Sequence, residues 1–204
     1  MFHLIGVAHR VQAQKKGEEL SADQKEFVKR LGDAIKAIKP VLVAEEFSEH
    51  ALRKLSKDNG TEFESVTRTV AESCGVEYRG CDPDDAARKK MGYVEGSDIA
   101  LRLAMSDDGN GLSNAEINDR GFATEVAKYW PLREAFWLDQ LRDVLEREVV
   151  FVCGDAHIES FREVLKRNKV DSDVLHRGIG VSRRDAEFWA TVMKYLAAHP
   201  ELSR

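Results

Sequence analysis

The sequence predicts an α/β fold in which a mostly parallel central sheet of about four to six strands is flanked by helices. Short apolar segments alternate with amphipathic helical segments along the chain, which is typical of doubly wound sheets. Three of the apolar segments are hydrophobic on both faces, as strands buried between two helical layers must be. Several helical segments also begin with capping signals, which separate them from the strands.

The expected strands are short apolar segments bounded by glycine, proline or aspartate. They are residues 2–8, 41–45, 76–81, 149–153 and, with a weaker pattern, 174–176. The expected helix starts are capping boxes, in which a serine or threonine precedes a glutamine or glutamate by three positions. These pairs are Ser21 with Gln24, Thr61 with Glu64, and Ser113 with Glu116. Pro131 and Asp155 each suit the start of a further helix, and a last helix is expected over about 182–198.

A chain of 204 residues suits one domain better than two. We therefore expect a single α/β domain over 1–204. Residues 84–130 are mostly helical in pattern and are expected to be an insertion between the third and fourth strands.

The composition excludes several classes of protein. Hydrophobic residues make up 43% of the chain, the net charge is −5 and the basic residues are scattered, which argues against nucleic-acid binding. No apolar run approaches the roughly 20 residues that cross a bilayer, and the apolar N-terminus is too short for a signal peptide. The three cysteines show no Cys-x-x-Cys spacing, which fits a reducing compartment. We therefore expect a cytoplasmic protein without membrane contact.

The chemistry is expected where strands end, because ligands of open parallel sheets bind beyond the carboxyl ends of the strands. Two Gly-x-Ala-His turns, at 6–9 and 154–157, end the first and fourth strands. Their histidines, with carboxylates after the second and third strands, predict one shared polar site for a metal or for acid–base chemistry. The bland alternative is that loops at strand ends are polar in any case.

We assign roles to these residues as follows. The expected catalytic residues are His9, Glu45, Arg133 and His157. The expected substrate-binding residues are Glu46, Asp82, Glu134 and Asp155. A metal, if bound, is expected on His9, Glu45 and His157, with Zn, Mn or Fe suited to imidazole and carboxylate ligands. Arg133 could equally form an ordinary surface ion pair, and one of the two glutamates could simply favour the start of a helix.

The order of these motifs resembles the TraB/ChaN/erythromycin-esterase superfamily, which includes the Tiki metalloproteases. The resemblance rests on Gly-x-Ala-His, Lys-Pro-Val-Leu-Val-Ala-Glu-Glu, Arg-Glu-x-x-Trp and the segment VVFVCGDAHIESFREVL, and it covers most of residues 1–175. It implies that His9, Glu45, Arg133 and His157 are polar site residues. Asp82 resembles an acidic residue that occurs in the pheromone-shutdown branch of the superfamily. The esterase branch carries a glutamate in its first element, where this chain has Val7 and Ala8.

Three functions follow from these patterns. The first is a hydrolase acting on a small-molecule or peptide substrate, either with a divalent metal or with a histidine that activates water. The second is a non-catalytic binder of a small anion, metal or haem at the same edge. The third is an interaction module with a degenerate site, because fold alone does not guarantee chemistry. A homo-oligomer is compatible with each of them.

Overall fold

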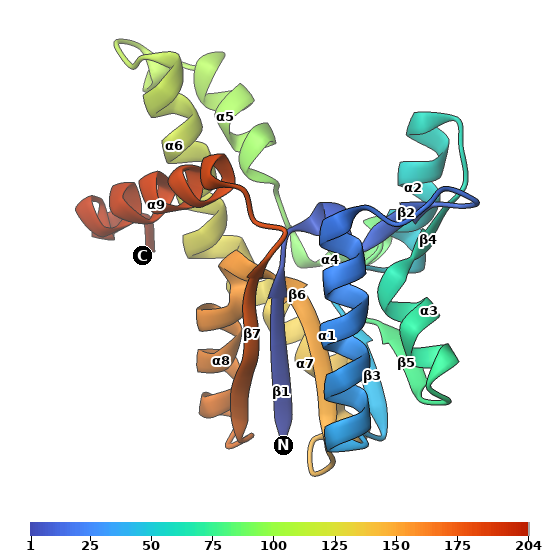
Figure 1. Cartoon of the computed structure of the whole chain (residues 1–204). Helices are drawn as coiled ribbons and strands as arrows, with labels where there is room; N and C mark the ends of the chain where they lie inside the picture. Colours follow the sequence, from blue (N-terminus) through green and yellow to red (C-terminus); the bar gives the residue numbers. More distant parts are fainter. Residues whose placement is uncertain (204) are drawn as a thin grey trace. The chain divides into compact units, whose positions relative to one another are not determined.

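The structure is a computed structural model that describes residues 1–203, without the side chain of residue 107. The chain divides into two compact units. The first unit holds Met1–Asp84 and Phe136–Val181, and the second holds Asp85–Ala135 and the segment that starts at Ser182. The expected alternation of strands and helices lies in the first unit (Figure 1).

The first unit contains a five-stranded sheet in the order β5-β3-β6-β1-β7, and all of its pairings are parallel. The strands are β1 (Phe2–Val7), β3 (Leu42–Glu45), β5 (Glu77–Gly80), β6 (Val149–Gly154) and β7 (Ser172–Ile179). The prediction of a parallel central sheet flanked by helices is therefore confirmed. The last strand is longer than the three residues expected, because it pairs with β1 along its length through two register shifts.

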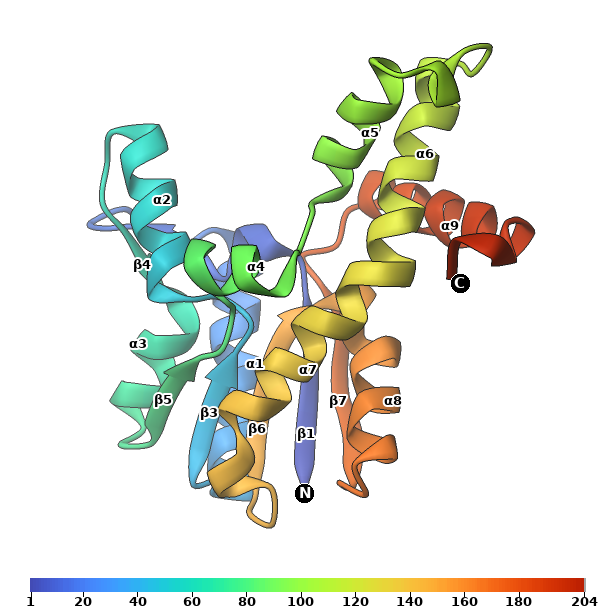
Figure 2. The same cartoon turned by 180° about the vertical axis from the view of Figure 1, so that it is seen from behind.

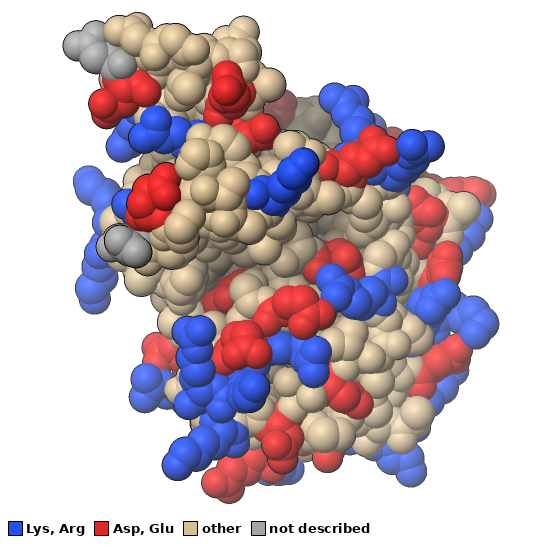
Figure 3. Space-filling model, turned by 90° about the vertical axis from the view of Figure 1, so that its left-hand side faces the viewer, with Lys and Arg blue, Asp and Glu red and all other residues tan. Residues whose placement is uncertain are grey.

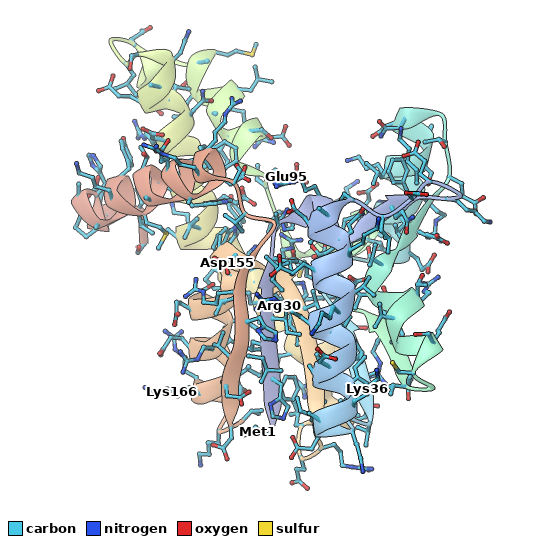
Figure 4. The ribbon with its side chains drawn as sticks, in the orientation of Figure 1. Met1, Arg30, Lys36, Glu95, Asp155 and Lys166 are labelled. Atoms are coloured by element: carbon cyan, nitrogen blue, oxygen red, sulfur yellow. The ribbon has the colours of Figure 1, made fainter. Side chains whose placement is uncertain are left out.

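Parallel pairing brings the carboxyl ends of all five strands to one edge of the sheet, here called the carboxyl edge. β1 lies between β6 and β7, and its end pairs Val7 with Gly154 and with Ile179. Figure 4 shows Asp155 at this edge and Met1 at the opposite end of β1. The strand-end residues of the sequence are thus collected on one side of the first unit.

Helices cover both faces of this sheet (Figures 1 and 2). α1 (Ala22–Ile38) and α3 (Val66–Ser73) pack on one face, and α8 (Ile158–Arg167) packs on the other with the part of α7 (Trp130–Gln140) that starts at Phe136. The alternation of side chains along each strand feeds two separate cores. The α1 core includes Ile5, Val43 and Val152, whereas the α8 core includes Leu4, Ala44 and Phe151.

The capping signals are realised in two of three cases. Ser21 with Gln24 and Ser113 with Glu116 form complete capping boxes at α1 and α6 (Asn114–Thr124). The prediction of a capping box at Thr61 with Glu64 is wrong. The residues after it form β4 (Phe63–Ser65), which pairs antiparallel with β2 (Ala13–Lys15). Strand pairing extends the chain there, so α3 begins at Val66 with Ser65 as its cap.

Short elements complete the first unit near the carboxyl edge. Two 3₁₀ turns lie there, η1 (His9–Val11) after β1 and η5 (Asp155–His157) after β6. A third, η4 (Arg142–Val144), follows α7 and precedes β6, so it lies at the opposite edge of the sheet. α2 (Glu49–Asn59), a helix that the sequence patterns above do not predict, lies between β3 and β4.

The second unit is helical. Its elements are α4 (Asp85–Met91), α5 (Gly96–Ala104), η2 (Asp107–Gly109), α6, a π-helical turn η3 (Glu125–Tyr129), the first residues of α7, α9 (Arg183–Ala198) and η6 (Pro200–Ser203). The helical segment expected over 84–130 thus forms a unit together with the C-terminal helix. Phe122 of α6 contacts Phe188 of α9 edge-on, with ring centroids 5.1 Å apart.

The surface carries charges of both signs. Lys and Arg are interspersed with Asp and Glu over the face seen in Figure 3. Within residues 1–203, no helix combines the length and the apolar character that crossing a bilayer requires.

Candidate functional site

The two Gly-x-Ala-His turns pack against each other at the carboxyl edge, and their glycines make this packing possible. A Cβ atom added at Gly154 would lie 2.6 Å from His9 Nε2 and 3.2 Å from Glu46 Oε1. A Cβ atom added at Gly6 would lie 2.9 Å from Ile158 Cγ1 and 3.2 Å from Asp155 Cα. Each glycine therefore leaves space that the other turn, or the helix start after it, occupies.

The His9 imidazole lies beside a buried carboxylate. His9 Nε2 is 2.6 Å from Glu46 Oε1, and the side chain of His9 is 57% exposed whereas that of Glu46 is 1% exposed. The same oxygen accepts the backbone N–H of Gly154 at 2.7 Å. The Glu46 carboxylate is thus fixed by β6, and it presents one oxygen to an imidazole that solvent can reach.

Backbone bonds place the two partners of this contact. The Glu46 N–H donates to Val152 O at 3.0 Å, which extends the β3–β6 ladder by one residue. The Ala8 N–H donates to Ile179 O at 2.9 Å, and η1 then turns His9 away from the strand. Four strands, β3, β6, β1 and β7, therefore define where His9 and Glu46 meet.

The second histidine has a different environment, although its sequence motif is the same. His9 is the first residue of its 3₁₀ turn, whereas His157 is the last residue of η5. His157 is 3% exposed and contacts the Trp137 ring edge-on, with ring centroids 5.0 Å apart. The Trp137 Nε1–H donates in turn to Asp82 Oδ1 at 3.1 Å. Asp82 and His157 are therefore brought together through Trp137, whose contact with them the motifs did not predict.

Asp155 is engaged within the scaffold. Its Oδ1 accepts the Gly178 N–H at 2.8 Å, and the Arg177 guanidinium lies 3.4 Å from the same oxygen. This carboxylate fixes the end of β7 to η5. Asp155 therefore stabilises the carboxyl edge by joining these two segments.

Glu45 points to the face of the sheet opposite to Glu46, because consecutive strand residues alternate. Its carboxylate is fully buried and accepts hydrogen bonds from the hydroxyls of Ser65 and Tyr78 and, at 3.4 Å, from Gln12 Nε2. Burial raises the pKa of Glu45 to about 7, against these hydrogen bonds, which favour the charged form. Among the hydrogen-bond partners of Glu45, only Ser65 has a local signal in the sequence, because it precedes the amphipathic pattern of α3.

The raised pKa of Glu45 predicts a pH-dependent stability. The carboxyl contributes stability fully below its ordinary pKa of 4.5, and this contribution is lost as pH rises through about 7. A Glu45→Gln variant lacks this dependence. Its free energy of unfolding, relative to that of the wild type, should therefore rise by about 2–3 kcal/mol between pH 5 and pH 8. Urea unfolding of both proteins at the two pH values measures the difference. A wild-type-to-variant difference that does not change with pH would contradict the assignment.

Arg133 and Glu134 belong to the second unit. Glu134 is 1% exposed. Burial raises the pKa of Tyr93 in the same unit, and the positive charge of Arg133 opposes this increase. Tyr93 donates a hydrogen bond to Glu125 Oε1 at 2.5 Å, and Glu125 also accepts the Gly96 N–H at 2.8 Å. His9, Glu46 and Gly154 lie together in the first unit.

The predicted metal ligands do not fit a metal in this arrangement. Both oxygens of Glu45 are engaged by Ser65, Tyr78 and Gln12 on the α1 face, away from Glu46 and His9. Within residues 1–203, no three His, Cys, Asp or Glu side chains are grouped so that they could hold a metal ion. The side chains in contact at this edge are the His9 imidazole and the Glu46 carboxylate.

No family model, curated protein or solved structure matches this chain. The resemblance to the TraB/ChaN/erythromycin-esterase superfamily therefore stays a prediction from sequence motifs. What the chain does has to be inferred from the site itself.

Proposed function

We propose that this chain is a hydrolase in which His9, oriented by Glu46, activates water. The observation that supports this proposal is the 2.6 Å contact between His9 Nε2 and the buried Glu46 Oε1. A carboxylate beside an imidazole fixes the ring and its tautomer, and it stabilises the imidazolium that forms when the ring takes a proton. An exposed imidazole on a buried carboxylate is suited to general-base catalysis.

The proton transfers follow from this tautomer. With the Nε2 proton directed at Glu46, the basic lone pair of His9 is on Nδ1. Nδ1 takes a proton from a water molecule, and the water oxygen bonds to the carbonyl carbon or phosphorus of the substrate. The bond to the leaving group then breaks, and the imidazolium returns its proton to the leaving group. Hydrolysis of an ester, amide or phosphoester is balanced by these steps alone.

A panel of ester, amide and phosphoester substrates tests the proposal. We expect the wild-type protein to turn over at least one class, and the His9→Gln variant to lose that turnover. His199→Gln is the matched control, because His199 is also exposed and lies 3.0 Å from a glutamate, Glu201, in the second unit. Turnover that survives His9→Gln would contradict the proposal. Tight binding of a small ligand at His9 without any turnover would favour the non-catalytic alternative.

A further inference from the structure

We infer that Glu45 is a positioning residue, which fixes the turn that carries His9 by holding Gln12. This inference rests on the proposed function, since it concerns the placement of the proposed base. It gives Glu45 no contact with substrate.

One oxygen of Glu45 is anchored to the scaffold. Glu45 Oε1 accepts the Tyr78 hydroxyl at 2.5 Å and the Ser65 hydroxyl as well. Ser65 is itself fixed, because its Oγ accepts the Arg68 N–H at 3.0 Å as the cap of α3. The carboxylate is therefore held by β5 and by the start of α3, and its second oxygen faces Gln12.

Gln12 transmits this anchor to the His9 turn. The side chain is fully buried, and its Nε2 donates to Glu45 Oε2 at 3.4 Å. Its backbone N–H donates to His9 O at 3.1 Å, and its carbonyl accepts the Val66 N–H at 2.9 Å. Gln12 thus connects the backbone of His9 to a carboxylate on β3 in two hydrogen-bonded steps.

The orientation of the Gln12 amide indicates that Glu45 controls it. Among the described residues, Gln12 Oε1 has no hydrogen-bond partner although it is buried. Leaving a buried acceptor unpaired destabilises the folded state. This orientation directs Nε2, the donor of the amide, at Glu45 Oε2, which accepts the hydrogen bond through its lone pair.

The two successive glutamates at the end of β3 therefore hold the same turn from opposite faces. Glu46 holds the His9 ring, and Glu45 holds the residue that ends the turn. This arrangement explains why a buried carboxylate is kept on the α1 face, where an apolar side chain would fill the core at lower cost.

Two variants test this positioning role, with His9 and Gln12 as reporters in the full chain. Glu45→Leu removes the acceptor, and Gln12→Met removes the amide with little change in size. Hydrogen exchange of the residue 12 amide should quicken roughly tenfold in both variants, which corresponds to the loss of about one hydrogen bond. The pH at which the His9 ring titrates, followed by NMR and assigned by the signal absent from His9→Gln, should fall by about half a unit or more.

Two further variants separate positioning from general destabilisation. Val70→Ala truncates a buried side chain of the same core and should leave the His9 titration unchanged. Glu45→Gln should keep the residue 12 amide exchange and the His9 titration close to their wild-type values. The new glutamine amide at residue 45 can still accept from the Tyr78 hydroxyl and can donate to Gln12 Oε1. Wild-type exchange and titration in folded Glu45→Leu and Gln12→Met would overturn the inference, and Gln12→Met alone decides it if Glu45→Leu does not fold. The amide exchange does not depend on catalysis, so a chain without hydrolase activity could still confirm the contact.

Discussion

Replacing His9 with glutamine should lower kcat about 10²- to 10⁴-fold on any substrate that the wild-type protein hydrolyses. The glutamine amide can still donate a hydrogen bond to Glu46, but it cannot accept a proton from water. Because the His9 side chain is largely exposed, the free energy of unfolding should change by less than about 1 kcal/mol. Steady-state kinetics and urea unfolding of the same preparation measure the two effects separately.

The control for this variant is His199→Gln, which should keep the wild-type kcat. An equal loss of activity in both variants would show that the effect is not specific to His9. A His9→Gln protein with wild-type kcat would leave the imidazole without a chemical role.

A methyl group at residue 154 should displace the His9 ring from Glu46. In Gly154→Ala the new Cβ would lie 2.6 Å from His9 Nε2, and the exposed ring can move away at little cost in stability. We expect kcat to fall about 10- to 100-fold, since displacement of a catalytic group by about 1 Å can cost 10²-fold in rate. The free energy of unfolding should fall by less than about 1 kcal/mol.

The matched variant is Gly6→Ala, at the same position of the other turn. Its Cβ would meet the fully buried Ile158 side chain and the backbone of Asp155, neither of which can move away freely. Gly6→Ala should therefore lower the free energy of unfolding by about 1–3 kcal/mol, as overpacking does. Wild-type kcat in Gly154→Ala, or equal stability losses in the two variants, would contradict the reciprocal packing of the turns.

The sheet could be predicted because burial on both faces leaves a direct mark on sequence. Phe2–Val7 and Val149–Gly154 are buried along their whole length, so their apolar runs identify strands of a parallel sheet. The site at the carboxyl edge follows from the same strands, because their ends must meet there. Strand pairing that depends on distant partners could not be predicted in this way. The pairing of β4 with β2 is such a case, and it displaced the helix start expected at Thr61.

The roles of the individual site residues were harder to predict. The sequence motif is the same at His9 and His157, yet one is exposed and the other is buried against Trp137. The difference arises because each histidine occupies a different position in its 3₁₀ turn, which depends on where the strand before it stops pairing. The choice between Glu45 and Glu46 likewise depends on which face each residue takes at the end of β3, and adjacent identical residues carry no signal for that choice.

The titration of the His9 ring tests the central claim most directly, namely that His9 and Glu46 form one acid–base couple. NMR titration of the wild-type protein and of Glu46→Gln compares the same ring with and without a negative charge beside it. The couple predicts that His9 titrates at a lower pH in Glu46→Gln, by about one unit, because the carboxylate favours the imidazolium. Equal titration midpoints in the two folded proteins would contradict the couple and the hydrolase proposal that depends on it.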